Sequence, residues 1–218
     1  MENKKWPSKI FITGIDTDAG KSYATGWLAN LINREGGNAM TMKFVQTGNK
    51  DFSEDIEVHR KIMGIEPAAV DLIHLTAPEI FSYPCSPELA ARIDGREIDF
   101  RLITDAADQL NREYDTVIIE GAGGLMVPLK GDYLTLDYIR EHRLPVVLVT
   151  NGKLGSINHT LMSLYAIKHA GITLQAVIYN SYFDKDKIIA QDTRNYIKHW
   201  LDTYFDGTEF LEMGPIRF

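Results

Sequence analysis

Short apolar segments alternate with segments of helical periodicity along most of this chain. The apolar segments are rich in Val and Ile and show little polar alternation, which is typical of strands buried on both faces of a parallel sheet. The strands predicted in this way span residues 10–13, 39–44, 116–119, 145–150 and 174–179. The helices predicted between and after them span residues 22–34, 54–63, 100–112, 134–141, 157–169 and 187–204.

The order of these elements predicts an α/β fold. Gly36-Gly37 and Gly171 follow two of the helical segments, where left-handed residues commonly end a helix, and Ser86-Pro87 is typical of a helix start. Residues 71–84 are the least regular and are interpreted as a long connection over the active face. We predict a single doubly wound domain over residues 1–218, with a mainly parallel sheet flanked by helices and ligands at the carboxyl ends of the strands.

Composition and charge argue against several classes of binding partner and cellular location. The net charge of −7 argues against a nonspecific nucleic-acid or anionic-membrane partner. No apolar stretch approaches the roughly 20 residues that a membrane span needs, and residues 1–9 are polar without an apolar signal region. The single cysteine, Cys85, excludes an internal disulfide and suits a reducing compartment. We therefore expect a soluble, cytoplasmic protein that binds neither nucleic acid nor membrane.

Residues 10–22, IFITGIDTDAGKS, carry the strongest chemical signal. A predicted strand is followed by a small-residue loop and then a helix, the setting in which backbone N–H groups and a helix N-terminus hold phosphates. Lys21 would reach the terminal phosphates and the Ser22 hydroxyl would ligate Mg²⁺. Gly14 and Gly20 are separated by five residues rather than the usual four, so the match to a P-loop is close but not strict.

Charged residues also stand at the ends of other predicted strands. Glu120 directly follows an apolar strand and precedes a glycine-rich segment, where Mg²⁺ beside a phosphate loop needs an oxygen ligand. Lys43, at the end of the second strand, could stabilise charge that develops during transfer, or could simply close an exposed strand end. Asp55, on a predicted first helical turn, could ligate metal or only interact with the helix dipole.

Taken together, these motifs resemble those of the dethiobiotin synthetase family. The matching segments are GIDTDAGKS (14–22), KFVQTG (43–48), SP (86–87), EGAGG (120–124) and KLGSINH (153–159), in the family's order over residues 10 to about 181. Phe44 stands where the family commonly has proline, and Glu88 where histidine is frequent. The resemblance implies a P-loop NTPase type of fold.

The resemblance also implies a reaction in biotin biosynthesis. An amine of 7,8-diaminononanoate and CO₂ form a carbamate, ATP phosphorylates the carbamate, and the second amine closes the ureido ring with loss of phosphate. The products are dethiobiotin, ADP and phosphate. The family needs Mg²⁺, uses no organic prosthetic group and forms homodimers, so ATP, the diamine, CO₂ and a second copy of the chain are the implied partners.

The resemblance also implies roles for individual residues of this sequence, according to the family positions that they match. Lys21 and Lys43 would act as catalytic cations, and Ser22, Asp55 and Glu120 would hold Mg²⁺. Thr47 would bind the substrate, and Asn158 would reach it across the dimer interface. Asn180 matches the residue that reads adenine. The full nucleotide-binding set is Asp18, Ala19, Gly20, Lys21, Ser22, Tyr23, Asp55, Glu120, Gly121, Ala122, Gly123, Asn180 and Ser181.

Two other functions compete with this interpretation. A partition-type or maturation ATPase would use the same fold as a dimer switch, but the position of its usual extra lysine is Asp16 here. A ligase with an amidotransferase partner would need a glutamine-hydrolysing domain that does not fit into 218 residues. Because the carbamate and the amine do the attacking, Cys85 is expected to be a packing residue and His159 a structural or interfacial one.

Overall fold

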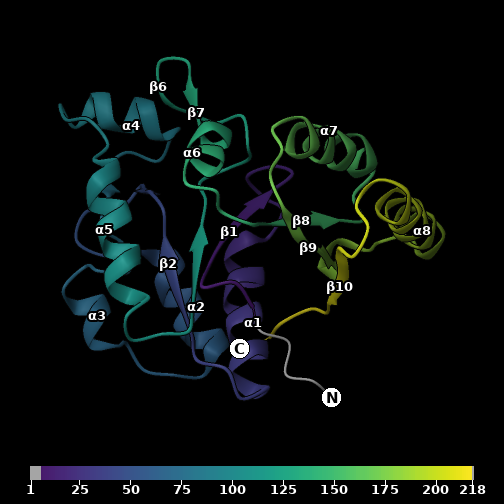
Figure 1. The fold of residues 1–218 in the computed structure, drawn as a ribbon, viewed down its shortest axis with the longest axis horizontal. Coiled ribbons are helices and arrows are strands. Elements are labelled where there is room, and N and C mark those ends of the chain that lie inside the picture. The colour runs from purple at the N-terminus through teal and green to yellow at the C-terminus, as the bar shows by residue number, and fades with distance from the viewer. Residues whose placement is uncertain (1–5, 218) are drawn as a thin grey trace.

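The computed structural model describes residues 6–217 and is built around a six-stranded sheet (Figure 1). The strands lie in the order β10-β9-β8-β1-β5-β2, and every neighbouring pair is parallel. Their bounds are β1 (Lys9–Gly14), β2 (Ala39–Lys43), β5 (Thr116–Glu120), β8 (Val146–Asn151), β9 (Leu174–Asn180) and β10 (Glu209–Met213). The predicted parallel sheet is confirmed, with each of the predicted strands shifted by only a residue or so at its ends.

Each predicted helix is also present, with ends that differ from the prediction by no more than two residues. They are α1 (Lys21–Arg34), α2 (Glu54–Met63), α5 (Phe100–Leu110), α6 (Thr135–Glu141), α7 (Ser156–His169) and α8 (Lys187–Tyr204). The short helix α4 (Pro87–Ile93) begins at the predicted Ser86-Pro87, although the Ser86 side chain makes no capping hydrogen bond. Gly36 and Gly171 have φ of +89° and +66°, as expected for residues that follow a helix.

Residues 71–84 differ from the prediction of one irregular connection. They begin within the short helix α3 (Ala69–Leu72) and include β4 (Ile80–Phe81), which pairs in parallel with β3 (Gln46–Thr47). A second small ribbon joins β6 (Pro128–Lys130) to β7 (Tyr133–Leu134). Strands of two or three residues are too short to produce a periodic pattern, so the sequence does not reveal them.

Helices cover both faces of the sheet because successive strand residues point to opposite sides. Ile10 and Ile12 of β1 belong to the apolar cluster that includes α1, whereas Phe11 belongs to the cluster that includes α5, α6, α7 and α8. This arrangement is the predicted doubly wound one. It leaves the carboxyl ends of the strands uncovered by either helical layer, which is where ligands of such folds bind.

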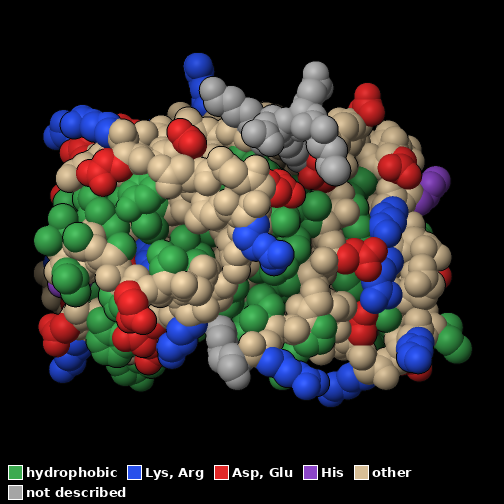
Figure 2. Space-filling view, turned by 90° about the horizontal axis from the view of Figure 1, so that it is seen from below, with side chains coloured by type: hydrophobic (Ala, Val, Ile, Leu, Met, Phe, Trp, Pro, Cys, Tyr) green, Lys and Arg blue, Asp and Glu red, His purple; other side chains and the backbone are tan. Residues whose placement is uncertain are grey.

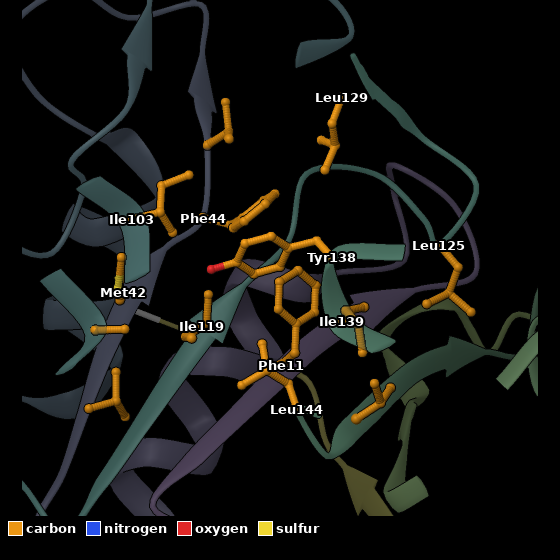
Figure 3. Close-up of a cluster of buried hydrophobic side chains, with 14 of the residues drawn as sticks. Phe11, Met42, Phe44, Ile103, Ile119, Leu125, Leu129, Tyr138, Ile139 and Leu144 are labelled. Atoms are coloured by element: carbon orange, nitrogen blue, oxygen red, sulfur yellow. The ribbon is translucent and has the colours of Figure 1, made fainter. Parts of the chain in front are cut away.

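Aromatic side chains anchor the strand end beside Lys43. Phe44, the residue in place of a common proline, packs with Phe11 and Tyr138 at ring-centroid distances of 5.4 Å and 4.7 Å (Figure 3). All three are almost completely buried. Burial of such side chains contributes about 1.5–3 kcal/mol each, so Phe44 fixes the backbone from which Lys43 extends.

Within residues 6–217, no helix combines the length and apolar character needed to cross a membrane. On the face shown in Figure 2, Lys and Arg side chains are interspersed with Asp and Glu rather than gathered into one basic patch.

Candidate active site

A cavity of about 1150 Å³ opens at the carboxyl ends of β1, β2, β5 and β9. Small-molecule pockets commonly occupy about 300–1,000 Å³, so this cavity has room for a nucleotide and a second ligand. Most of the site residues predicted from sequence line it together: Asp18, Gly20, Lys21, Ser22, Tyr23, Lys43, Thr47, Asp55, Glu120, Ala122, Gly123 and Asn180.

The loop between β1 and α1 forms one wall of the cavity. Gly20 has a φ of +90°, and a Cβ atom there would lie 2.2 Å from Asn180 Nδ2, so only glycine fits. Helix α1 then begins at Lys21, which is only 5% exposed. Its Nζ donates hydrogen bonds to the carbonyl oxygens of Asp16 and Thr17 at 3.0 Å and 3.2 Å. A buried ammonium beside the positive end of a helix forms an anion-binding site.

Three charged side chains meet next to this loop, each placed by the end of an element. Lys43 ends β2, Glu120 ends β5, and Asp55 lies in the first turn of α2. The start of α2 is fixed by Ser53, whose hydroxyl accepts a hydrogen bond from Ile56 N at 3.2 Å. Because β2 and β5 are parallel neighbours with Lys43 opposite Glu120, both side chains reach the same edge of the sheet.

The side chains of this cluster are in direct contact. Lys43 Nζ lies 2.5 Å from Asp55 Oδ2 and 2.8 Å from Glu120 Oε1. Ser22 Oγ lies within hydrogen-bond distance of both carboxylates, at 2.6 Å from Asp55 Oδ1 and 3.0 Å from Glu120 Oε1. One lysine and one hydroxyl thus bring two carboxylates together at the mouth of the phosphate loop.

Burial and charge act in opposite directions on the ionisation of these groups. Burial would raise the pKa of Glu120, but the charge of Lys43 and the hydrogen bond from His59 outweigh it and hold that pKa well below the usual range. Burial would likewise lower the pKa of Lys43, yet Glu120 and Asp55 raise it above its ordinary value. For Lys21, burial dominates and lowers the pKa. The Lys43–Glu120 pair is therefore ionised at neutral pH.

His59 is a contact of Glu120 that the sequence analysis missed. Its side chain is fully buried, with Nε2 2.5 Å from Glu120 Oε2 and Nδ1 3.0 Å from Thr41 Oγ1. The available signal was its spacing, because His59 lies four residues after Asp55 and so on the same face of α2.

Asn180 connects the phosphate loop to the end of β9. Its Nδ2 donates to the carbonyl oxygen of Ala19 at 3.2 Å, and its Oδ1 accepts from Tyr182 N at 3.1 Å. Next to it, Ser181 Oγ donates to the carbonyl oxygen of Met213 at 3.0 Å and ties β10 to the same region. The segment after β10 reaches the cavity as well, with Gly214 and Ile216 in its lining.

Four predicted site residues do not line the cavity: Ala19, Gly121, Asn158 and Ser181. Ala19 is buried within the loop, and a Cβ at Gly121 would lie 2.7 Å from the Phe11 ring, so Gly121 is required for packing. Asn158 is exposed on α7, with Nδ2 3.6 Å from Met162 Sδ. Within one chain, Asn158 therefore stands apart from the other candidates.

Cys85, Glu88 and His159, which the sequence analysis also discussed, lie outside the cluster around Glu120. Cys85 is partly buried and lines the cavity, and its Sγ lies 3.5 Å from the Ser86 carbonyl oxygen. Glu88 Oε1 accepts a hydrogen bond from Gly131 N at 2.8 Å. His159 is exposed on α7. None of these contacts reaches the cluster around Glu120.

The donor atoms of the cluster suit a hard divalent cation. In the part of the chain that the structure describes, no group of three or more His, Cys, Asp or Glu is arranged to hold a metal. Ser22, Asp55 and Glu120 instead offer one hydroxyl and two carboxylates, with the hydroxyl within hydrogen-bond distance of both. Mg²⁺ usually takes one or two carboxylates and completes its shell with phosphates and water, so these residues fit Mg²⁺.

The chain is similar to a known family model and to several known proteins. Residues 8–204 match a family model described as an AAA domain. ATP-dependent dethiobiotin synthetase BioD 2 of Pasteurella multocida is 46% identical over 207 residues, which cover 95% of this chain and 97% of that protein. The BioD 2 protein of Haemophilus ducreyi is 47% identical over 94% of this chain and 97% of its own length. The BioD protein of Chlorobaculum tepidum is 47% identical over 91% of this chain and 83% of its own length.

Proposed function

The chain belongs to the ATP-dependent dethiobiotin synthetase family, and we propose that its cavity carries out that reaction with the residues described above. The reaction is the carboxylation of 7,8-diaminononanoate with CO₂ and the closure of its ureido ring at the expense of ATP. The observation that carries the assignment of residues is the contact of Lys43 with Asp55 and Glu120, directly beside the phosphate loop.

Phosphoryl transfer to a carbamate brings an anion toward the polyanionic end of ATP. Cations must suppress this repulsion while the site holds the carbamate oxygen in line with the phosphorus atom. Lys21 and the backbone N–H groups of residues 18–23 would hold the phosphates, and Lys43 would face the attacking carbamate. No side chain needs to act as a nucleophile, because carbamate oxygen attacks phosphorus and the second amine then attacks the carbonyl carbon and expels phosphate.

Ser22, Asp55 and Glu120 would hold Mg²⁺ in this scheme. When bound, Mg²⁺ would neutralise phosphate charge. The residues themselves contribute a preformed set of oxygen donors, since Lys43 keeps the two carboxylates close together despite their like charge. Asn180 would contact the base while its Nδ2 supports the loop at Ala19.

The substrate would lie beside Thr47 and the segment 84–87, both of which line the cavity. Asn158 is exposed rather than directed into this cavity, which supports a role toward a second copy of the chain. We propose a homodimer in which Asn158 of each chain completes the substrate site of the other. We also propose a cytoplasmic location, because a chain with a single cysteine suits a reducing compartment.

The direct test is synthesis by the purified protein. Labelled CO₂, ATP, Mg²⁺ and 7,8-diaminononanoate are incubated with it, and labelled dethiobiotin is separated and counted. Wild type and Lys198→Met should form product, since Lys198 lies on α8 and its described contacts, with Glu212 and the Phe210 ring, do not involve the cavity. Lys43→Met should form almost none. Absence of labelled dethiobiotin with the wild type would refute the activity, and full activity of Lys43→Met would refute the assignment of the site.

A further inference from the structure

The two oxygens of Glu120 have different surroundings. Oε1 faces Lys43 Nζ at 2.8 Å and Ser22 Oγ at 3.0 Å, on the cavity side. Oε2 faces away from these groups and lies 2.5 Å from His59 Nε2. His59 and Glu120 are 0% and 1% exposed, so no bulk water competes for this contact. One oxygen is available to a cation, and the other is held by the histidine.

The neighbouring hydrogen bonds define the direction of the contact. Arg60 donates from Nη1 to Thr41 Oγ1 at 2.7 Å, and its guanidinium can only donate. Arg60 is itself fixed by two hydrogen bonds to Asp71, at 2.8 Å and 2.7 Å. Because Thr41 Oγ1 accepts from Arg60, its own hydrogen is free to point to His59 Nδ1 at 3.0 Å. The ionised carboxylate of Glu120 can only accept, so His59 Nε2 carries a hydrogen and donates it to Oε2.

We propose that His59 is a positioning residue that restricts Glu120 to one-oxygen ligation and so favours Mg²⁺ over Ca²⁺ at this site. The inference rests on the proposed metal role of Glu120. Rotation of the carboxylate to offer both oxygens would break the His59 hydrogen bond and leave a buried N–H without an acceptor. Mg²⁺ needs compact octahedral coordination, whereas Ca²⁺ takes more oxygens and accepts two from one carboxylate. Holding Oε2 therefore disfavours the larger ion.

A purely structural role for His59 would affect stability and leave the choice of ion unchanged. The discriminating quantity is the dissociation constant of a non-hydrolysable ATP analogue, measured by calorimetry in Mg²⁺ and in Ca²⁺. The preference is the ratio of the two values. His59→Leu removes the donor at similar volume and should reduce the preference for Mg²⁺ about tenfold, in the range of other changes around metal ligands.

Two variants control this measurement. His59→Gln retains an N–H donor within reach of Glu120 and should restore most of the preference for Mg²⁺. Asn30→Leu removes a hydrogen bond between α1 and α2, the helix that carries His59, from Asn30 Nδ2 to the Ile62 carbonyl oxygen at 2.7 Å, without touching Glu120. It should leave the preference within twofold of wild type.

The outcomes separate this inference from the proposed function. If the wild type binds the analogue equally with and without Mg²⁺, the proposed metal site is wrong and the inference falls with it. If wild-type binding requires Mg²⁺ but His59→Leu has the wild-type preference, only the positioning role is overturned. If His59→Leu fails to fold, the same ratio of dissociation constants is measured for Thr41→Val, which removes the hydroxyl that orders the His59 ring. A shift toward Ca²⁺ supports the inference, and an unchanged ratio overturns it.

Discussion

Replacement of Lys43 by methionine tests the central cluster most directly. The variant keeps a side chain of similar length and removes the positive charge that lies 2.5 Å from Asp55 and 2.8 Å from Glu120. Removing one member of a buried ion pair typically costs about 3–5 kcal/mol, because the remaining charge is uncompensated. Ser22 and His59 also contact the carboxylates and are not changed by the substitution, so we expect a loss of about 3 kcal/mol in the free energy of unfolding at pH 7.

The loss of stability in Lys43→Met should become smaller as the pH falls. In the wild type, the folded-state pKa of Glu120 lies well below its ordinary value of 4.5, so Glu120 contributes stability above that value and the contribution declines as the pH falls. Without Lys43, burial and the neighbouring Asp55 raise the folded-state pKa of Glu120. Acid then protonates Glu120 in the folded variant and removes the repulsion. The difference in stability between the two proteins should therefore shrink between pH 7 and pH 4.5.

Urea unfolding at both pH values measures these differences. Lys198→Met, which breaks an exposed pair, is the matched control and should change stability by about 1 kcal/mol or less at either pH. The same Lys43 variant should lose at least about a hundredfold in kcat, the effect of removing one group that stabilises transition-state charge, with a smaller change in ATP affinity. A loss of stability as small as that of the control, or one that is the same at both pH values, would refute the reasoning about the cluster.

Three further predictions follow from the geometry of the site. Glu120→Gln should lose most turnover with Mg²⁺ while keeping the wild-type circular dichroism spectrum; full activity would contradict a metal role for Glu120. Gly20→Ala should weaken ATP binding at least about tenfold, because its Cβ would lie 2.2 Å from Asn180 Nδ2; an unchanged dissociation constant would contradict the fit of the loop. Mixing inactive Lys21→Ala and Asn158→Ala chains should restore activity in verified heterodimers, since one site receives both defects and the other neither; no recovery would contradict the shared site.

The parts of the fold that the sequence predicted are those where burial determines residue type. Strands β1, β5 and β8 have apolar cores because both faces are covered, and so their bounds could be recognised. Strand β10 was missed because it lies at the edge of the sheet and is mostly half-buried. It therefore tolerates Glu209 and Glu212 and lacks a continuous apolar run. Its position beside β9 became clear only from the register in the sheet.

The residues of the site likewise include some that the sequence predicted and some that it did not. Lys21 and Ser22 were predictable because a phosphate loop needs them at fixed spacing, and Glu120 because it follows a strand directly. His59 was harder to predict, because its spacing from Asp55 was the only signal and histidine is intermediate between the residue types usually buried and those usually exposed. Its burial depends on Gly26 of α1, where a Cβ would lie 3.1 Å from His59 Cα. This close approach of two helices is a tertiary property that local sequence does not encode.

The surroundings of the two lysines explain why they should serve different steps. Lys43 is balanced by two carboxylates, and its pKa is raised by them despite burial. Lys21 donates to the carbonyl oxygens of Asp16 and Thr17, and burial lowers its pKa. A buried ammonium held by carbonyl oxygens gains more from an arriving phosphate than one that already faces two carboxylates, because the phosphate repays its desolvation. Nucleotide affinity is therefore expected to depend mainly on Lys21, and transition-state stabilisation on Lys43.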